Sequence, residues 1–335
     1  MKRYLWRRIG LGALTIVATT LLVHLALYLA PGDPIGYLLN GQPATPERVA
    51  ALRAQFHLDD PFFTRYVSWV SDVLQGDLGF SASFNTDVST LIASRLPTTI
   101  YLVLISFVFI SVFGLTMGIL AGLNKGGIDS FSMATATILS SIPAFVGSFI
   151  LINVFALNLG WFPAIGAGDG SLPSAISHMT LPAIALAFSA GAFVARTTRA
   201  SIRVESSSEH VTTATVRGIP RRKVVSRHIV RNALLPIISL GGLLFVGLIV
   251  STAFVEQAFA INGIGGLLVV AARQQDFALV QAITLIMVIS FVVVNLAVDI
   301  LYWILDPRIR SEVALCQLVK LRLEEIGDTE SALVN

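Results

Sequence analysis

Six long apolar stretches limit what this chain can fold into more than any other feature of its sequence. They cover roughly residues 9–30, 98–123, 131–157, 174–195, 233–255 and 278–305. A helix that crosses a bilayer needs about 20 mostly apolar residues, and in lipid its backbone groups must bond to one another. The sequence therefore predicts an all-α membrane protein with six transmembrane helices. The fourth stretch is the weakest of the six, because Pro173 and Pro182 interrupt it.

The composition excludes several other classes of protein. Hydrophobic residues make up 55% of the 335 residues and charged residues only 13%. An average soluble domain carries about 25% charged residues. The net charge of +3 is small and spread over the connecting segments, so nucleic acid is not expected as a partner. A single cysteine, Cys316, permits neither an internal disulfide nor a Cys/His metal cluster.

The distribution of lysine and arginine indicates the orientation, because these residues accumulate in cytoplasmic segments. Eighteen of the 23 lie before the first stretch, between the second and third, between the fourth and fifth, or after the sixth. Both termini are therefore predicted to be cytoplasmic. The first stretch is longer than the apolar core of about 7–15 residues in a signal peptide, so we expect an uncleaved anchor.

With this orientation the chain divides into four parts, each with a distinct expected place. These parts are a cytoplasmic stub with the first span (1–30), a long extracytoplasmic loop (31–97), a five-span core (98–310) and a cytoplasmic tail (311–335). Within the long loop, large apolar residues recur at helical spacing. They are Phe62, Tyr66, Trp69, Val70 and Val73. This short aromatic helix is expected either to lie at the bilayer surface or to form a platform for an extracytoplasmic partner.

Motifs of enzymes and of ion-coupled transporters are largely missing. The chain has no Gly-x-x-x-x-Gly-Lys-[Ser/Thr], His-Glu-x-x-His or Gly-x-Ser-x-Gly sequence. The string Gly166-Ala-Gly168-Asp169 is similar to a motif of intramembrane aspartyl proteases, but it lies in a polar outward segment and is interpreted as a turn. Only His24 and Asp299 are clearly ionisable within the apolar stretches, which is too few for a proton relay. We expect His24 to be an interfacial or bundle-facing group and Asp299 to pair locally, near Arg308 and Arg310.

The second stretch carries glycine at every fourth position, at Gly114, Gly118 and Gly122. Residues at this spacing lie on one face of a helix, and small residues there let another helix approach closely. The stretch is therefore predicted to pack inside a bundle or against another subunit.

The segment 196–232, called the basic loop below, holds nine of the 23 basic residues. Gly218 suits the left-handed position that ends a helix, and Pro220 suits the first turn of the next. After Pro220, apolar and basic residues fall on opposite faces. The charges alone are explained by topology and by contact with anionic lipid. The Gly-Pro joint and the ordered apolar face favour an element that docks onto another protein.

At this point the chain resembles a known family. The likeness extends in order along nearly the whole chain, through Leu74-Gln-Gly-Asp-Leu-Gly-Phe-Ser81, Arg95-Leu-Pro-Thr-Thr99, Arg196-Thr-Thr-Arg199, Glu209-His-Val211, Thr213-Ala214, Arg217-Gly218, Arg231-Asn-Ala-Leu-Leu-Pro236, Glu256 with Phe259 to Gly265, and Asn295 to Arg310. These motifs are similar to those of ABC importer permeases, and most of all to the first permease subunit of dipeptide and oligopeptide importers. Three features depart from the pattern: Thr212 in place of a glutamate, Asn262 in place of a proline, and the tail beyond Arg310.

The resemblance implies a type I importer permease in a bacterial inner or plasma membrane. It implies a second homologous permease, two cytoplasmic ATPase subunits and an extracytoplasmic peptide-binding protein as partners. The ATPases would bind ATP and magnesium, so this chain would hold no cofactor and no catalytic residue. The part of the basic loop expected to dock on an ATPase comprises Glu209, His210, Val211, Thr213, Ala214, Arg217, Gly218, Ile219 and Pro220.

Two matters stay open at the level of sequence. Polar residues within the spans are only weak candidates for the translocation path; they are Ser140, Ser141, Asn153 and Ser251. The cargo is expected to be a dipeptide or oligopeptide, with glutathione or a metal chelate as further options. The alternative function is an ion-coupled secondary transporter, which would need no ATPase.

Overall fold

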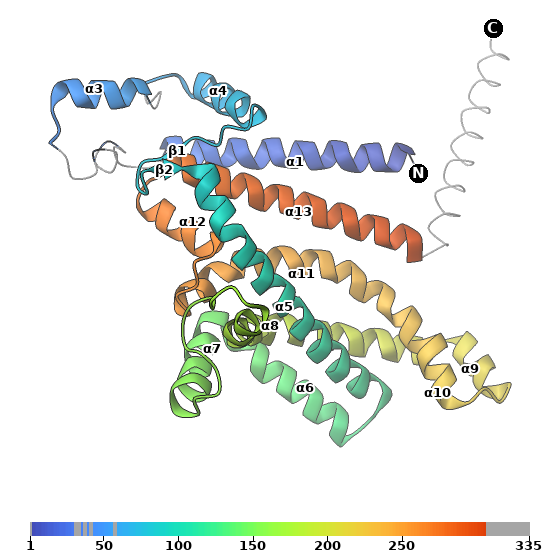
Figure 1. Cartoon of the computed structure of the whole chain (residues 1–335). Coiled ribbons are helices and arrows are strands. Elements are labelled where there is room, and N and C mark those ends of the chain that lie inside the picture. Colours follow the sequence, from blue (N-terminus) through green and yellow to red (C-terminus); the bar gives the residue numbers. More distant parts are fainter. Residues whose placement is uncertain (1, 30–34, 36–38, 40–42, 56–58, 306–335) are drawn as a thin grey trace, which may run out of the picture.

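The chain is mostly helical, as the sequence predicts (Figure 1). The computed structural model describes all residues except 1, 30–34, 36–38, 40–42, 56–58 and 306–335. In this part of the chain, four single helices are long and apolar enough to cross a membrane. They are α1 (Lys2–Leu29), α5 (Val88–Leu123), α8 (Leu172–Ser206) and α13 (Phe277–Leu305). The fifth predicted span lies within another long helix, α11 (Arg231–Ala258).

The third predicted span is not the continuous helix that the apolar run suggested. It is broken into α6 (Gly127–Ser140) and a second segment made of α7 (Ala144–Leu151) and the π-helical η1 (Ile152–Asn158), with a bend of 99° between them. Pro143 precedes α7 and explains the break, because proline has no N–H to donate and disfavours helix at the residue before it. The break was not expected from the apolar run, and the crossing of the membrane by 131–157 and the count of six spans stay predictions.

Helices α5 and α8 form the centre of the bundle, and their glycines allow the close approach. A Cβ added at Gly114 would lie 2.6 Å from Val194, and one at Gly122 would lie 2.6 Å from Ile202. At Gly118 a Cβ would overlap Thr198. The predicted packing role of this stripe is confirmed. Pro182 lies buried inside α8 without ending the helix, since neighbouring helices cover it.

The end of the bundle that the sequence predicts to be extracytoplasmic carries several short elements. Here lie α3 (Pro46–Gln55), α4 (Phe62–Leu74), a two-stranded hairpin of β1 (Phe80–Ser81) and β2 (Thr86–Asp87), and α12 (Ile264–Arg273). The predicted aromatic helix is confirmed as α4. Helix α5 begins at Val88, so the predicted boundary between residues 97 and 98 falls inside a helix. Ser81 donates a 2.6 Å hydrogen bond to the buried Asp276, which fastens the hairpin to the start of α13.

The two ionisable groups of the apolar stretches both contact neighbouring helices. His24 is buried and its Nδ1 contacts the side-chain amide of Gln281 on α13. Asp299 forms an ion pair with Arg8 of α1, with 3.1 Å between the Arg8 Nε and the Asp299 Oδ2. Local pairing of Asp299 is thus confirmed with a partner that the sequence did not suggest. The partners proposed from the sequence, Arg308 and Arg310, lie outside the described residues.

At the opposite end of the helices from α3 and α4, three short elements form a compact projection (Figure 1). They are α9 (Glu209–Val216), α10 (Arg221–Lys223) and the π-helical η2 (Val224–Val230), which continues into α11. All three belong to the basic loop.

Candidate functional site

The basic loop folds back on itself through a defined helix end. Helix α8 stops at Ser206, and α9 starts at Glu209 as a helix of its own. After α9, the N–H of Ile219 donates to the carbonyl of Ala214, and the N–H of Gly218 donates to that of Thr215. This pair of bonds is the Schellman motif, and it needs a left-handed residue before Ile219. Gly218 supplies it with φ +74°. The predicted role of Gly218 as the helix end is confirmed, whereas Pro220, predicted in the first turn of the next helix, directly precedes α10 as its N-cap.

An apolar cluster fixes α9 against the rest of the protein. Val211 and Ala214 of α9 are buried together with Ile202 of α8 and with Val224 and Ile229 of η2. Since these side chains face inward, Val211 and Ala214 hold the helix in position and are not part of its outer surface. The predicted apolar face after Pro220 exists, but its backbone is π-helical from Val224 to Val230.

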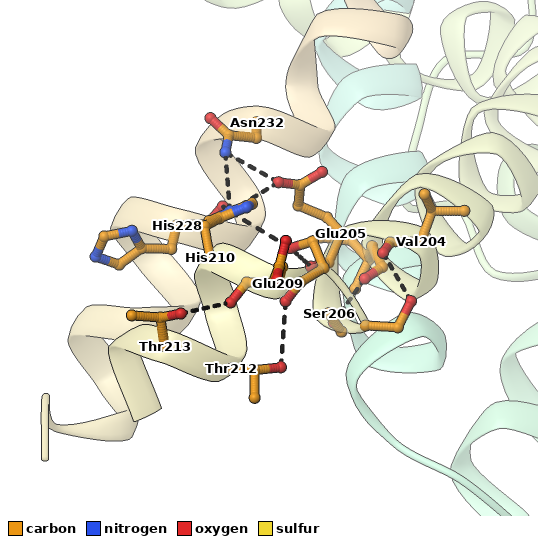
Figure 2. A network of polar contacts seen from close by, with 12 residues as sticks. Val204, Glu205, Ser206, Glu209, His210, Thr212, Thr213, His228 and Asn232 are labelled. Atoms are coloured by element: carbon orange, nitrogen blue, oxygen red, sulfur yellow. Dashed lines mark hydrogen bonds and ion pairs between the residues drawn. The ribbon is translucent and has the colours of Figure 1, made fainter. Parts of the chain in front are cut away.

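A polar network closes the loop on its other side (Figure 2). His210 of α9 and Asn232 of α11 both reach Glu205 at the end of α8. The imidazole Nε2 of His210 lies 3.0 Å from Oε1 of Glu205, and the Asn232 amide donates to the same oxygen at 2.9 Å. Three helices are thereby joined through one carboxylate. Glu205 was not among the predicted site residues, and its role depends on neighbours distant in sequence.

The outer face of the projection is what another protein would meet. Val216 is 82% exposed although it is apolar, and it sits in the last turn of α9. The other predicted docking residues on this face are Glu209, His210, Thr213, Arg217, Gly218 and Pro220, all exposed, with Ile219 half-buried. The exposed side chains of α9 are thus polar or charged except for Val216, which was not among the predicted docking residues.

Arginines of the basic loop also clamp the bundle. Arg199 and Arg203 of α8 both pair with Asp129 near the start of α6, and the Nη2 of Arg199 lies 2.8 Å from Oδ2. The Asp129 side chain is only 15% exposed. One turn before Arg199 along α8, Arg196 donates to Ser140 Oγ at 2.7 Å. These arginines therefore bind α6 to α8, in addition to any role in setting topology.

A second buried cluster lies at the opposite end of the bundle, beside α12, and was not predicted as a site. The carboxylate of Glu256 is fully buried and accepts hydrogen bonds from Thr99 Oγ1 at 2.7 Å and from the N–H of Gly266 at 2.6 Å. Thr99 also accepts the N–H of Ile264 at 2.8 Å. A side chain at Gly263 would overlap the carboxylate. Two sequence motifs, 95–99 and 256–265, thus meet in one cluster, but only the fold shows that they touch.

Comparisons with known proteins identify the family to which the chain belongs. Residues 114–311 match the family described as binding-protein-dependent transport system inner membrane component. Residues 1–103 match the N-terminal model of the same kind of protein. This chain belongs to that family. It is therefore a permease subunit of an ATP-binding-cassette importer.

Similar proteins agree with the assignment of this permease. A putative peptide permease protein of Brucella ovis is 35% identical over 318 residues, which cover 92% of the chain and 99% of that protein. A glutathione transport system permease protein of Escherichia coli is 35% identical over 297 residues, covering 88% of the chain and 95% of the relative. Among solved structures, an inward-facing MetNI methionine ABC transporter chain aligns with TM-score 0.53 at 18% identity, covering 65% of this chain and 97% of that chain. The last likeness shows the fold alone.

Each of the four weak path candidates of the permease has a polar partner in the structure. Ser140 bonds with Arg196, and Ser141 donates to the Thr137 carbonyl. Asn153 contacts Asn158, and Ser251 donates to the Gly247 carbonyl in its own helix. Their assignment to the path remains a prediction.

Asp169, the aspartate of the Gly-x-Gly-Asp string, stabilises a turn. Its Oδ1 accepts hydrogen bonds from the hydroxyl and the N–H of Ser171, at 2.7 and 3.0 Å. These bonds lower the pKa of the Asp169 carboxyl below its ordinary value. Both hydrogen bonds come from a residue two positions further along the chain, which fits the turn interpretation.

Replacing Asp129 with asparagine is expected to loosen α6 from α8. The change leaves two arginines without a counter-charge at a largely covered position, so the melting temperature of the purified permease should fall clearly. The matched control is Asp59→Asn, which removes the 2.8 Å pair with Arg53, where both side chains are considerably exposed. Equal melting temperatures for the two variants would show that the arginine clamp adds no stability.

Replacing Thr99 with valine is expected to destabilise the end of the bundle beside α12. The change leaves the Ile264 N–H and one Glu256 oxygen buried without a partner, at a cost of about 1–3 kcal/mol. On the same helix, the Thr116 hydroxyl bonds back to the Val112 and Phe113 carbonyls of its own helix, so Thr116→Val is the control. Hydrogen exchange at the start of α12 should rise in the first variant and not in the second.

Proposed function

We propose that this permease forms half of the translocation path of a peptide importer, with a second, homologous permease enclosing the other half. Two cytoplasmic ATPases bind and hydrolyse ATP with magnesium, and an extracytoplasmic binding protein delivers the cargo. The single observation that carries the proposal is the form of the basic loop. Its helix α9 packs through one face against an apolar cluster and exposes Val216 to solvent. Such an element transmits force only if it is rigid, and α9 is fastened on two sides.

The mechanism follows from the way α9 is attached. The exposed face of α9 and of the turn that follows it, from Glu209 to Pro220, sits in a groove of one ATPase. When the ATPase pair closes around nucleotide, it displaces α9, and the Glu205–His210–Asn232 network passes this displacement to α8 and α11 together. The Asp129–arginine clamp carries it on to α6. Nucleotide on one side and loaded binding protein on the other thus bias one two-state element.

Peptides are the proposed cargo, because both relatives described above are named for peptide or glutathione permeases. Both termini lie in the cytoplasm in this proposal, as the excess of lysine and arginine in those segments indicates. The surrounding membrane is the bacterial inner membrane. The binding protein makes most of the choice among peptides.

The proposal is tested at Val216 with a photo-reactive amino acid in place of valine. Irradiation of membranes is expected to join the permease to a protein that mass spectrometry identifies as an ATPase with a phosphate-binding loop. The same replacement at Ile128, which is 52% exposed at the start of α6 but lies outside α9, is the control. Capture at Ile128 and not at Val216 would exclude α9 as the docking element.

Transport itself separates this function from ion-coupled transport. Uptake of a labelled peptide into vesicles of the whole transporter is expected to require ATP and to survive a protonophore. Unlabelled glutathione as a competitor then tests the cargo. Uptake by the permease alone, abolished by the protonophore and indifferent to ATP, would contradict the proposal.

A further inference from the structure

Helix α4 presents two neighbouring apolar faces, and the first of them packs against α1. The Phe62 ring lies 5.2 Å from the His24 ring and 5.4 Å from the Tyr28 ring, measured between centroids. The Tyr66 hydroxyl lies 3.0 Å from the hydroxyl of Thr20. These contacts fix the position of α4 along α1.

The second face of α4 is not covered by the described part of the chain. Its large side chains are Phe63, Val67 and Leu74, which are 72%, 64% and 82% exposed. At 100° per residue they fall within one narrow stripe. Ser68 and Asp72 lie on the far side of the helix. The exposed stripe is therefore a continuous apolar surface with a polar surface opposite.

The contact with Thr20 sets the depth of α4. Thr20 lies near the middle of the membrane-crossing part of α1, Trp6–Leu29. Nine residues separate it from Leu29, which corresponds to about 14 Å of helix. Half of the hydrocarbon core is about 15 Å. Figure 1 shows α4 beside the outward third of α1, whereas α3 lies beyond the end of that helix. The Tyr66 ring thus reaches the depth of the acyl chains.

We propose that α4 is immersed in the outer leaflet, with Phe63, Val67 and Leu74 against lipid acyl chains. The membrane-crossing helix α1 also exposes large apolar side chains within three residues of Thr20, namely Val17 at 53% and Leu22 at 64%. Polar groups at this depth need partners within the protein, and the Tyr66 and Thr20 hydroxyls satisfy each other. Helix α4 is therefore a membrane element of the permease that anchors α1 from the side, and its outer stripe is not a docking face for a soluble partner.

The test uses nitroxide labels in the assembled transporter, reconstituted in vesicles of phosphatidylethanolamine and phosphatidylglycerol. Cys316→Ser removes the one native cysteine, and single cysteines are then placed by Phe63→Cys and Val67→Cys on the stripe and by Ser68→Cys and Asp72→Cys on the polar side. Leu14→Cys on the exposed surface of α1 is the lipid reference. Collisions of each label with oxygen, which concentrates in lipid, are compared with collisions with a water-soluble nickel chelate.

Labels at positions 63 and 67 are expected to collide mainly with oxygen, as at position 14, and labels at 68 and 72 mainly with the nickel chelate. Two results would overturn the proposal. Access of nickel to all four positions would place α4 in water. Protection of positions 63 and 67 from both reagents would show that protein, such as the second permease or the binding protein, covers the stripe.

Discussion

A permease with valine at position 218 is expected to insert normally and to lose ATP-driven uptake. Gly218 has φ +74°, where a β-branched residue is strained by about 1–2 kcal/mol or more. The strain is relieved by opening the Schellman bonds of Ile219 and Gly218, so the exposed end of α9 changes shape. Val211 and Ala214 still pack α9 against the apolar cluster. The measurement is uptake of labelled peptide, normalised to the amount of permease in the membrane.

The control for this variant is Gly126→Val. Gly126 also has φ +74°, also has open space where a Cβ would be, and lies in the turn between α5 and α6. With ψ −133° it lies outside the left-handed helical region, so a valine there should be strained at least as much as at position 218, but Gly126 lies outside α9. Uptake should therefore remain in the Gly126→Val variant. Loss in both variants would attribute the effect to strain alone, and normal uptake in the Gly218→Val variant would count against α9 as the force-transmitting element.

The second large effect is expected at Gly118, where replacement by leucine should prevent folding. A Cβ there would overlap Thr198 and approach the Ala195 carbonyl to 2.7 Å, and backbone cannot move aside as a flexible side chain can. Alanine at this position should already cost about 1–3 kcal/mol. The measurement is the yield of monodisperse permease in detergent, together with its melting temperature.

Gly10→Leu is the matched control for Gly118. Gly10 is also a helical glycine in an apolar span, and nothing lies within 4 Å of its Cβ position. Its replacement should leave yield and melting temperature nearly unchanged. If alanine at Gly118 melts at the same temperature as the natural protein, the close contact between α5 and α8 is not what holds the bundle.

Local rules explain which features could be predicted from the sequence. Apolar runs, the spacing of Gly114, Gly118 and Gly122, and the Gly218–Pro220 joint act through neighbours in sequence or through periodicity. They predicted the helical class, the packing face of α5 and the end of α9. The same rules did not predict the 99° bend at Pro143. Hydropathy measures how apolar a segment is and does not take into account that proline lacks an N–H for the helix.

The sequence by itself determined that this protein is a helical membrane protein with a kinked basic loop, because burial in lipid and left-handed backbone impose residue types locally. Only the tertiary structure decided which polar groups meet. Asp129 with Arg199, Glu205 with Asn232, and Glu256 with Thr99 are 70, 27 and 157 residues apart. The partner of a carboxylate cannot be predicted from the sequence, because it depends on which helices pack together. The same holds for α9, because only the fold shows that Val211 is buried and Val216 is exposed.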